Sequence, residues 1–397
     1  MVRGFQCFSF TLMVLAGCSS HYSWHSAKTG KTSESDPVSL SSHGDVSEKD
    51  IEALGDKKVV ALLLPLSGNF ASLGQAMQDA AQMALYDTNS TDIVLQPLDT
   101  GNDSFVATKA AQKAADNNAK LMIGPIFSAT TQAVAPIAKE HHINVISLSN
   151  DKSLAGNGVY LLGFLPSQQI QRVTEYATSR GIQNFAAIVP NDAYGTVAAD
   201  TFQQVVASRG GTVNRTEYYV NNPQLKLSLE RITSSVMGSM PQAEGPTPNA
   251  MLIPDGEPAL TKIASYVNPE GSKHTQLLGS GQWDNAQIFS NPALQGGWFA
   301  GAEPERRHAF EQRFQATFGY AAPRLASLAY DAVALAATLA KANAEDFSDV
   351  AITNPRGFAG IDGVFRLQNN GLPERGLAVL QIEDGSVRVI DPSPKKF

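Results

Sequence analysis

The stretch "VALLLPLSGNFASLGQAMQDAAQMALYD" (60–87) places an apolar run directly before a helical pattern. Residues 59–65 are continuously apolar as far as a proline, which is typical of a strand buried on both faces of a parallel sheet. After the Ser67-Gly68 bend, apolar residues recur at spacings of three and four, which predicts an amphipathic helix. This stripe consists of Leu73, Ala76, Met77, Ala80, Ala81, Ala84 and Leu85.

The same alternation of strand and helix recurs in two series along the chain, one before and one after Pro166. Long alternation of this kind predicts parallel sheets with helices on both faces, and two series predict two α/β lobes. Further strands of the first series are predicted at 92–99, 119–125, 143–149 and 158–166, with helices near 104–117 and 129–140. The second series has strands at 184–190, 212–220, 250–255 and 275–281, with helices near 167–180, 194–209, 224–236 and 257–267.

The chain after the two series contains the segment "GGWFAG" (296–301) and predicts a long helix and two hairpins. The helix covers 323–342, with an apolar stripe that must pack on one lobe. The hairpins turn around Asn369-Asn370-Gly371 and Asp384-Gly385, because such pairs suit turns that require positive φ.

The N-terminus predicts the compartment. An apolar run (5–17) follows Arg3 and ends at "LAGC", which resembles a bacterial lipoprotein signal. We therefore expect residues 1–17 to be a signal peptide, Cys18 to be lipidated, and 18–56 to be a disordered, Ser-rich tether. Ser19 follows the Cys, and a residue other than Asp at this position resembles an outer-membrane sorting signal. We therefore expect anchoring at the periplasmic face of the outer membrane rather than at the inner membrane.

Composition and motifs exclude several function classes. The chain has a formal net charge of -7 and no basic cluster, so no nucleic-acid partner is expected. The sequence lacks a Gly-x-Ser-x-Gly elbow, a His-Glu-x-x-His motif and a complete dinucleotide or phosphate-loop fingerprint. His141-His142 are adjacent rather than spaced for a metal ion. We therefore predict a protein that is not an enzyme, with no cofactor and no metal.

Candidate binding residues follow the strands, because open α/β sheets bind ligands beyond the carboxyl ends of their strands. The first series offers hydroxyl and amide groups, and the second adds an acid and two aromatic residues. Two of these residues have a simpler alternative, since Ser128 also suits a helix N-cap and Trp283 also suits a buried core. The predicted cleft residues are Ser67, Gly68, Ser128, Ser149, Asn150, Tyr194, Asp255 and Trp283.

Several motifs in order carry a family resemblance: the opening stretch, "LMIGPIFSATTQAVAPIAKEHHINVISLSND", "PNDAYGT", "LLGSGQWDN" and "PRLASLAYDAVALAATLA". Over 57–397 the chain resembles the leucine/isoleucine/valine-binding branch of the type 1 periplasmic binding fold. More narrowly, it resembles the alphaproteobacterial lipoproteins known as penicillin-binding protein activators. The resemblance implies an α/β protein of two lobes joined by three crossovers, with a cleft between them. Lobe one would comprise 57–165 and 300–345, and lobe two 166–299 and 346–397.

In amino-acid binders of this fold, the positions of Ser128 and Ser149-Asn150 hold the ligand carboxylate, and that of Tyr194 closes over the ligand. The acidic residue that receives the ligand ammonium is not evident in "LLGSGQWD" (277–284). Asp255 or Asp284 could substitute for it. Without a counter-charge, burying an ammonium group is costly.

Two functions remain open at this point. The favoured one is a lipid-anchored protein that binds and activates a penicillin-binding protein or another wall synthase in peptidoglycan synthesis. The alternative is the substrate-binding lipoprotein of an importer, with an amino acid or a similar small polar ligand in the cleft.

Overall fold

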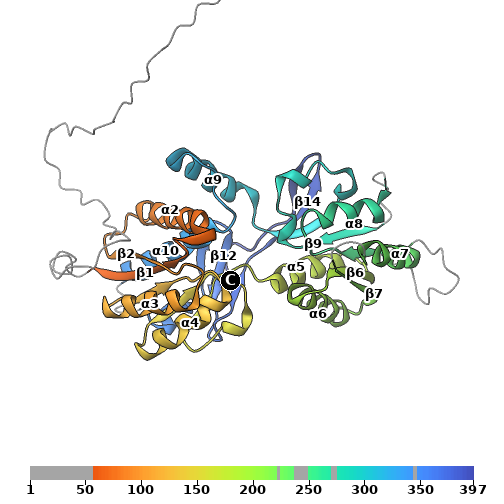
Figure 1. Ribbon diagram of the computed structural model, residues 1–397. Helices are drawn as coiled ribbons and strands as arrows, with labels where there is room; N and C mark the ends of the chain where they lie inside the picture. The colour runs from red at the N-terminus through yellow and green to blue at the C-terminus, as the bar shows by residue number, and fades with distance from the viewer. Residues whose placement is uncertain (1–56, 221–223, 237–248, 270–274, 343–346) are drawn as a thin grey trace, which may run out of the picture. The chain divides into compact units, whose positions relative to one another are not determined.

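The computed structural model describes residues 57–397 except for 221–223, 237–248, 270–274 and 343–346 (Figure 1). The predicted signal peptide, Cys18 and the tether lie outside the described residues. Among the residues that are described, no helix is both long and apolar enough to span a membrane.

The first lobe is built on a five-stranded parallel sheet in the order β2-β1-β3-β4-β5. Helices α2 and α10 cover one face and helices α3 and α4 cover the other (Figure 1). The predicted stripe is largely buried, with Leu73 at its edge. The strands are β1 (Lys58–Leu64), β2 (Ile93–Asp99), β3 (Leu121–Ile123), β4 (Asn144–Ser147) and β5 (Val159–Leu161). The helices are α2 (Ala71–Asp87), α3 (Ser104–Asp116), α4 (Ser128–Glu140) and α10 (Ala326–Lys341), with the short turn η1 (Gly68–Phe70) before α2.

Helix α2 requires glycine at one position in its first turn. A Cβ atom on Gly74 would lie 2.0 Å from the carbonyl oxygen of Pro65. This distance is far shorter than a van der Waals contact, so any residue with a Cβ atom would clash with the backbone. Glycine at this position therefore allows α2 to pack directly against the end of β1.

The second lobe is built on a seven-stranded sheet in the order β15-β14-β10-β9-β8-β6-β7. Helices α5 and α6 pack on one face, and α7 and α8 pack on the other. The strands are β6 (Asn184–Pro190), β7 (Thr212–Tyr219), β8 (Ala250–Leu252), β9 (Gln276–Gly279), β10 (Trp298–Gly301), β14 (Ala378–Glu383) and β15 (Ser386–Asp391). The helices are α5 (Pro166–Ser179), α6 (Ala193–Ser208), α7 (Gln224–Val236) and α8 (Ala259–Val267).

The predicted α/β fold class is confirmed, with one difference in the second sheet. Its strands β6 to β9 are parallel as predicted, and β10 adds a further parallel strand, but β14 pairs antiparallel with β10, and β15 antiparallel with β14. The predicted hairpin at Asp384-Gly385 therefore makes this sheet mixed.

The segment after 346 divides between the two cores. Its first part forms the short helix α11 (Asp349–Ile352) and a small antiparallel sheet of β11 (Phe358–Gly360), β12 (Gly363–Leu367) and β13 (Pro373–Arg375). Phe347, Ile352, Phe365 and Leu367 from this part belong to the core of the first sheet. Only β14 and β15 of this segment join the second sheet. The packing therefore differs from the prediction, which assigned all of 346–397 to lobe two.

The longest helix that was not predicted among the described residues is α9 (Pro304–Phe318). It buries only Phe310 and Phe314, which pack against α2. Two apolar residues on a charged helix give a weak periodic signal.

Candidate functional site

Asp99, at the end of β2, organises the predicted lip of the cleft. Its Oδ1 atom accepts hydrogen bonds from the backbone N–H groups of Leu66 (2.7 Å), Ser67 (3.2 Å) and Gly101 (2.8 Å). Burial raises the pKa of this carboxyl, but hydrogen bonds from Ser67, Gly101 and Leu66 outweigh burial and lower it. Ser67 and Gly68 are exposed on this turn and do not line the cavity described below.

The loops that carry Ser128 and Ser149 lie next to each other. The Ser128 and Ser149 hydroxyl oxygens lie 3.5 Å apart, and Ser149 Oγ also accepts the backbone N–H of Asp151 at 3.2 Å. Ser128 is the first residue of α4, where Phe127 holds the N-cap position, so the N-cap alternative for Ser128 is wrong. Ser149 is buried, whereas Asn150 is exposed and lines the cavity.

Tyr194 lies where the resemblance places it, on the second lobe at the start of α6. Its hydroxyl lies 2.6 Å from the carbonyl oxygen of Pro254 and 2.8 Å from Ser280 Oγ. Burial raises the pKa of Tyr194 to about 12. Since its hydroxyl group is engaged by the protein, Tyr194 offers the cavity mainly its ring.

Neither Asp255 nor Trp283 lines the cavity that contains Asn150, although Tyr194 lines both that cavity and the hollow beside Asp255. Asp255 accepts hydrogen bonds from the Tyr219 hydroxyl and the Gly256 backbone, and it borders a separate hollow of about 490 Å³. Trp283 has 0% exposed surface and donates from Nε1 to the carbonyl oxygen of Ile253 at 2.9 Å. The cleft role predicted for Trp283 is therefore corrected in favour of the core alternative.

The cavity at the carboxyl edges of the strands measures about 350 Å³ and takes residues from both lobes. Its walls are mostly apolar. Sequence reasoning missed most of them, because they come from segments far apart in the chain. The lining comprises Ile126, Phe127, Leu148, Asn150, Phe164, Pro166, Gln169, Tyr194, Gly281, Gln282, Asp284, Gly301, Ala302, Arg324, Leu325, Leu328, Asp362 and Leu377.

Asp284, one of the two acids that could have received an ammonium group, is already paired. It forms ion pairs with Arg307 and, at 3.8 Å, with Arg324. Only 11% of the Asp284 side chain is exposed, and burial raises its pKa despite both arginines. Arg307 also pairs with the more exposed Glu311 at 2.8 Å. An ammonium group would have to displace these partners.

Further charged side chains lie in the core next to Arg324. Arg324 Nη2 lies 2.9 Å from Asp362 Oδ1, and the guanidinium lies 4.1 Å from the centre of the Phe164 ring. Arg375 lies near the same ring at 5.0 Å and pairs with Asp331 at 3.9 Å. Arg307, Arg324 and Arg375 thus lie beside Asp284, Asp362 and Asp331, so each of these poorly exposed carboxyl groups has a guanidinium partner.

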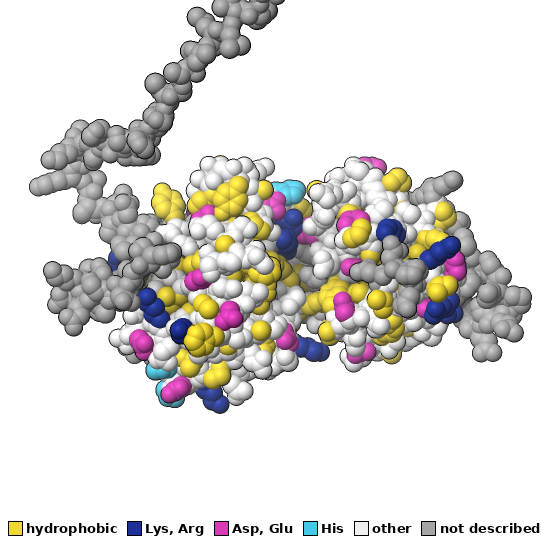
Figure 2. All heavy atoms as spheres, in the orientation of Figure 1, with side chains coloured by type: hydrophobic (Ala, Val, Ile, Leu, Met, Phe, Trp, Pro, Cys, Tyr) yellow, Lys and Arg dark blue, Asp and Glu magenta, His cyan; other side chains and the backbone are white. Residues whose placement is uncertain are grey.

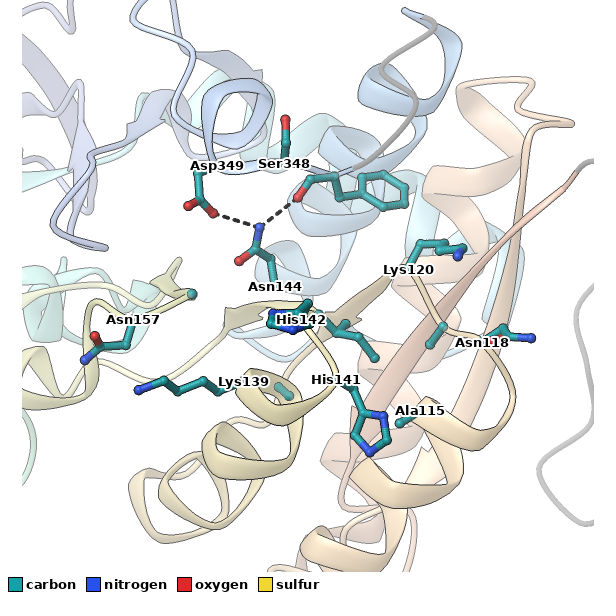
Figure 3. A pocket seen from close by; sticks show the side chains of 15 residues that line it. Ala115, Asn118, Lys120, Lys139, His141, His142, Asn144, Asn157, Ser348 and Asp349 are labelled. Carbon is teal, nitrogen blue, oxygen red and sulfur yellow. Dashed lines mark hydrogen bonds between the residues drawn. The ribbon is translucent and has the colours of Figure 1, made fainter.

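A larger hollow of about 690 Å³ lies at the opposite edge of the first sheet, before strands β3, β4 and β5 (Figure 3). Asn144 donates there to the carbonyl oxygen of Phe347 (2.8 Å) and to Asp349 (2.9 Å). The Lys120, Lys139 and His141 side chains point in different directions (Figure 3). This hollow therefore has no convergent set of binding groups.

Figure 2 shows Lys and Arg side chains scattered among acidic ones on the face that it displays. Within the described residues, no group of three or more His, Cys, Asp or Glu side chains is placed to hold a metal ion.

The two α/β lobes and the cavity between their strand ends define the class of two-lobed periplasmic ligand-binding proteins. The family described as periplasmic binding protein matches residues 59–386, and the chain belongs to this family. A putative branched-chain amino acid ABC transporter protein from Rhodospirillum rubrum has a TM-score of 0.74 at 19% identity, covering 84% of this chain and all of that one. The leucine binding protein LivK from Thermotoga maritima has a TM-score of 0.61 at 20% identity, covering 85% and 99%.

Two curated relatives are also similar in sequence. The uncharacterized protein RP748 of Rickettsia prowazekii is 24% identical over 226 residues, 57% of this chain and 60% of its own length. The penicillin-binding protein activator LpoA of Photobacterium profundum is 27% identical over 177 residues, 44% of this chain. The match spans only 28% of that activator's length.

Proposed function

We propose that this protein is a non-enzymatic, lipid-anchored periplasmic protein that binds and activates a penicillin-binding protein in peptidoglycan synthesis. The similarity to a penicillin-binding protein activator supports the partner. The "LAGC" signal supports lipidation at Cys18, and Ser19 supports anchoring at the periplasmic face of the outer membrane. The partner would dock on a lobe surface, and the cleft would have a regulatory role.

The observation that carries this proposal is that several polar groups of the cleft already have partners within the protein. The Ser149 and Tyr194 hydroxyls are bonded to the protein, and Asp284 is held between Arg307 and Arg324. A zwitterionic amino acid would have to break these contacts before forming its own, and unpaired buried polar groups are costly. This favours a regulatory protein over an amino-acid carrier.

A second candidate function is solute binding for an importer. The cavity of about 350 Å³ favours it, since small-molecule sites are concave and mostly apolar. Solved proteins of similar fold include solute-binding proteins of ABC transporters, one of them from Rhodopseudomonas palustris BisB5 in complex with 3,4-dihydroxybenzoic acid (TM-score 0.63, 19% identity, covering 86% of this chain and 97% of that one).

In-cell crosslinking of the tagged full-length protein, followed by affinity purification and mass spectrometry, separates the two functions. We expect a penicillin-binding protein among the crosslinked proteins, because activation requires direct contact. A Cys18→Ala variant controls for the compartment, and it should yield less of the same partner at equal expression because it lacks the anchor. Recovery of an inner-membrane permease without any wall synthase would instead establish the importer function.

A further inference from the structure

Residues 392–397 leave the second lobe and reach the first lobe. Strand β15 ends at Asp391, which pairs with Arg172 of helix α5 at 2.6 Å and is thereby held in the second lobe. Beyond it, the centre of the Phe397 ring lies 4.6 Å from the guanidinium carbon of Arg366, on strand β12 beside the core of the first sheet. Figure 1 shows this end of the chain next to β12. We call residues 392–397 the strap.

The strap crosses two of the segments that connect the lobes, and we call these connecting segments the hinge. Glu303, between β10 and α9, accepts hydrogen bonds from the backbone N–H and the hydroxyl group of Ser393, both at 2.9 Å. Gly376 lies between β13 and β14, and a Cβ atom there would be 2.7 Å from Cγ of Pro394. Pro394 therefore packs directly against the backbone of this second hinge segment.

Phe397 fixes the far end of the strap to the first lobe. A Cβ atom on Gly357 would lie 2.9 Å from Cδ2 of the Phe397 ring, so the ring packs directly against this glycine. The Arg366 guanidinium lies over the same ring, and a cation over an aromatic face is attracted to it. Glu374 pairs with this guanidinium at 2.7 Å, which keeps the guanidinium in position over the ring.

These contacts limit how far the lobes can rotate relative to each other. A segment of six residues spans at most about 20 Å when it is fully extended. The strap is held in the second lobe next to Asp391 and in the first lobe by Phe397. A large rotation that moves β15 away from β12 must therefore break the hydrogen bonds between Ser393 and Glu303 or withdraw the Phe397 ring. Contacts that exist in only one arrangement of the lobes shift the population toward that arrangement.

We infer that the strap restrains the hinge and thereby controls the width of the cleft from outside the cleft. The strap, all of which the structure describes, contributes no residue to the lining of the cavity between the strand ends. Release of the strap would therefore free the lobes while every residue that lines this cavity stays unchanged. This inference goes beyond the proposed function and does not depend on it, because it concerns the motion of the lobes and not their partner.

Double electron–electron resonance between spin labels on the two lobes tests the inference. The labels are attached at Gln132→Cys on α4 and Gln204→Cys on α6, which are both exposed, in a full chain whose own Cys7 and Cys18 are replaced by serine. We expect a single narrow distribution of distances for this parent protein. In Ser393→Ala/Phe397→Ala the population outside that distribution should rise about tenfold, because the variant loses one hydrogen bond to a carboxylate and the contacts of the ring.

Two further variants complete the experiment. A chain that stops after Asp391 lacks every strap contact and should show a still larger population outside the parent distribution. The matched control Lys395→Ala/Lys396→Ala changes two exposed strap residues and should keep the parent distribution. Circular dichroism of each sample reports whether the fold is intact.

Three results would overturn the inference. The first is an equally narrow distribution in the parent and in both strap variants. The second is a control variant that widens the distribution as much as Ser393→Ala/Phe397→Ala does. The third is a widened distribution accompanied by loss of the circular dichroism signal, because the fold, and not the hinge alone, would then depend on the strap.

Discussion

Replacing Arg375 by methionine is expected to destabilise the protein by about 3–5 kcal/mol, because the substitution leaves buried carboxylates without their cation. Only 2% of the Arg375 side chain is exposed, and it faces Asp331, whose side chain is 0% exposed. Its Nη2 atom also donates to the carbonyl oxygen of Leu162 at 2.8 Å. Chemical denaturation should show the loss as a lower midpoint.

A matched control and a double variant separate the charge from the loss of packing. Arg366→Met makes the same change on neighbouring strand β12, where the pair with Glu374 is about one-third exposed, so we expect at most about 1 kcal/mol. Adding Asp331→Asn to Arg375→Met removes the buried carboxyl group that the guanidinium faced, which would otherwise have to take up a proton, and should restore part of the stability. An additive double variant would contradict the electrostatic explanation.

The repeated strand–helix pattern made most of the fold predictable. The stripe of α2, the parallel strands and both C-terminal hairpins follow from local periodicity and turn residues, which a single sequence records. The pattern could not predict which of the two cores residues 347–375 join. The alternation of Phe365 and Leu367 indicates a strand with one buried face, and such a strand could pack on either lobe. Helix α9 was missed for a related reason, since it buries two aromatic residues rather than a full stripe.

The cleft was less predictable than the fold. Sequence reasoning found residues that follow strands, such as Asn150 and Tyr194, because the position after a strand is a local signal. It could not find the ion pairs of Arg324, whose partners Asp284 and Asp362 lie about forty residues away on either side. Nothing in the sequence indicated that Asp284 would already be paired with Arg307. A carboxylate that receives a ligand ammonium group has to be free of such a partner.

Asp331 should make the folded protein less stable as the pH rises, whereas an ordinary ion-paired carboxylate makes it more stable. Burial and the neighbouring charge of Asp362 raise the pKa of Asp331 to about 7, although Arg375 opposes the shift. Although burial acts in the opposite direction, Arg324 and Arg375 lower the pKa of Asp362 below its usual value, so that group stays charged. The folded protein therefore retains a proton on Asp331 that the unfolded chain releases near pH 4.

The sign of the effect follows from this proton. The stabilisation is fully present below about pH 4 and is lost as the pH rises through about 7, because above pH 4 only the folded state still binds the proton. Relative to Asp331→Asn, the wild type should lose up to about 1.4 kcal/mol of unfolding free energy per pH unit between about pH 5 and 7. Groups common to both proteins cancel in this difference.

Denaturant unfolding of the wild type and Asp331→Asn at several pH values from 5 to 8 measures the difference. The amide of asparagine can keep the hydrogen bond that Oδ1 accepts from the backbone of Ile361 at 2.8 Å, so the variant changes the proton and little else. Asp384→Asn, at an exposed turn with φ of 50°, controls for removing a carboxylate. Parallel pH profiles for wild type and Asp331→Asn would mean that Asp331 is already ionised in the folded protein at pH 5, which would contradict a raised pKa.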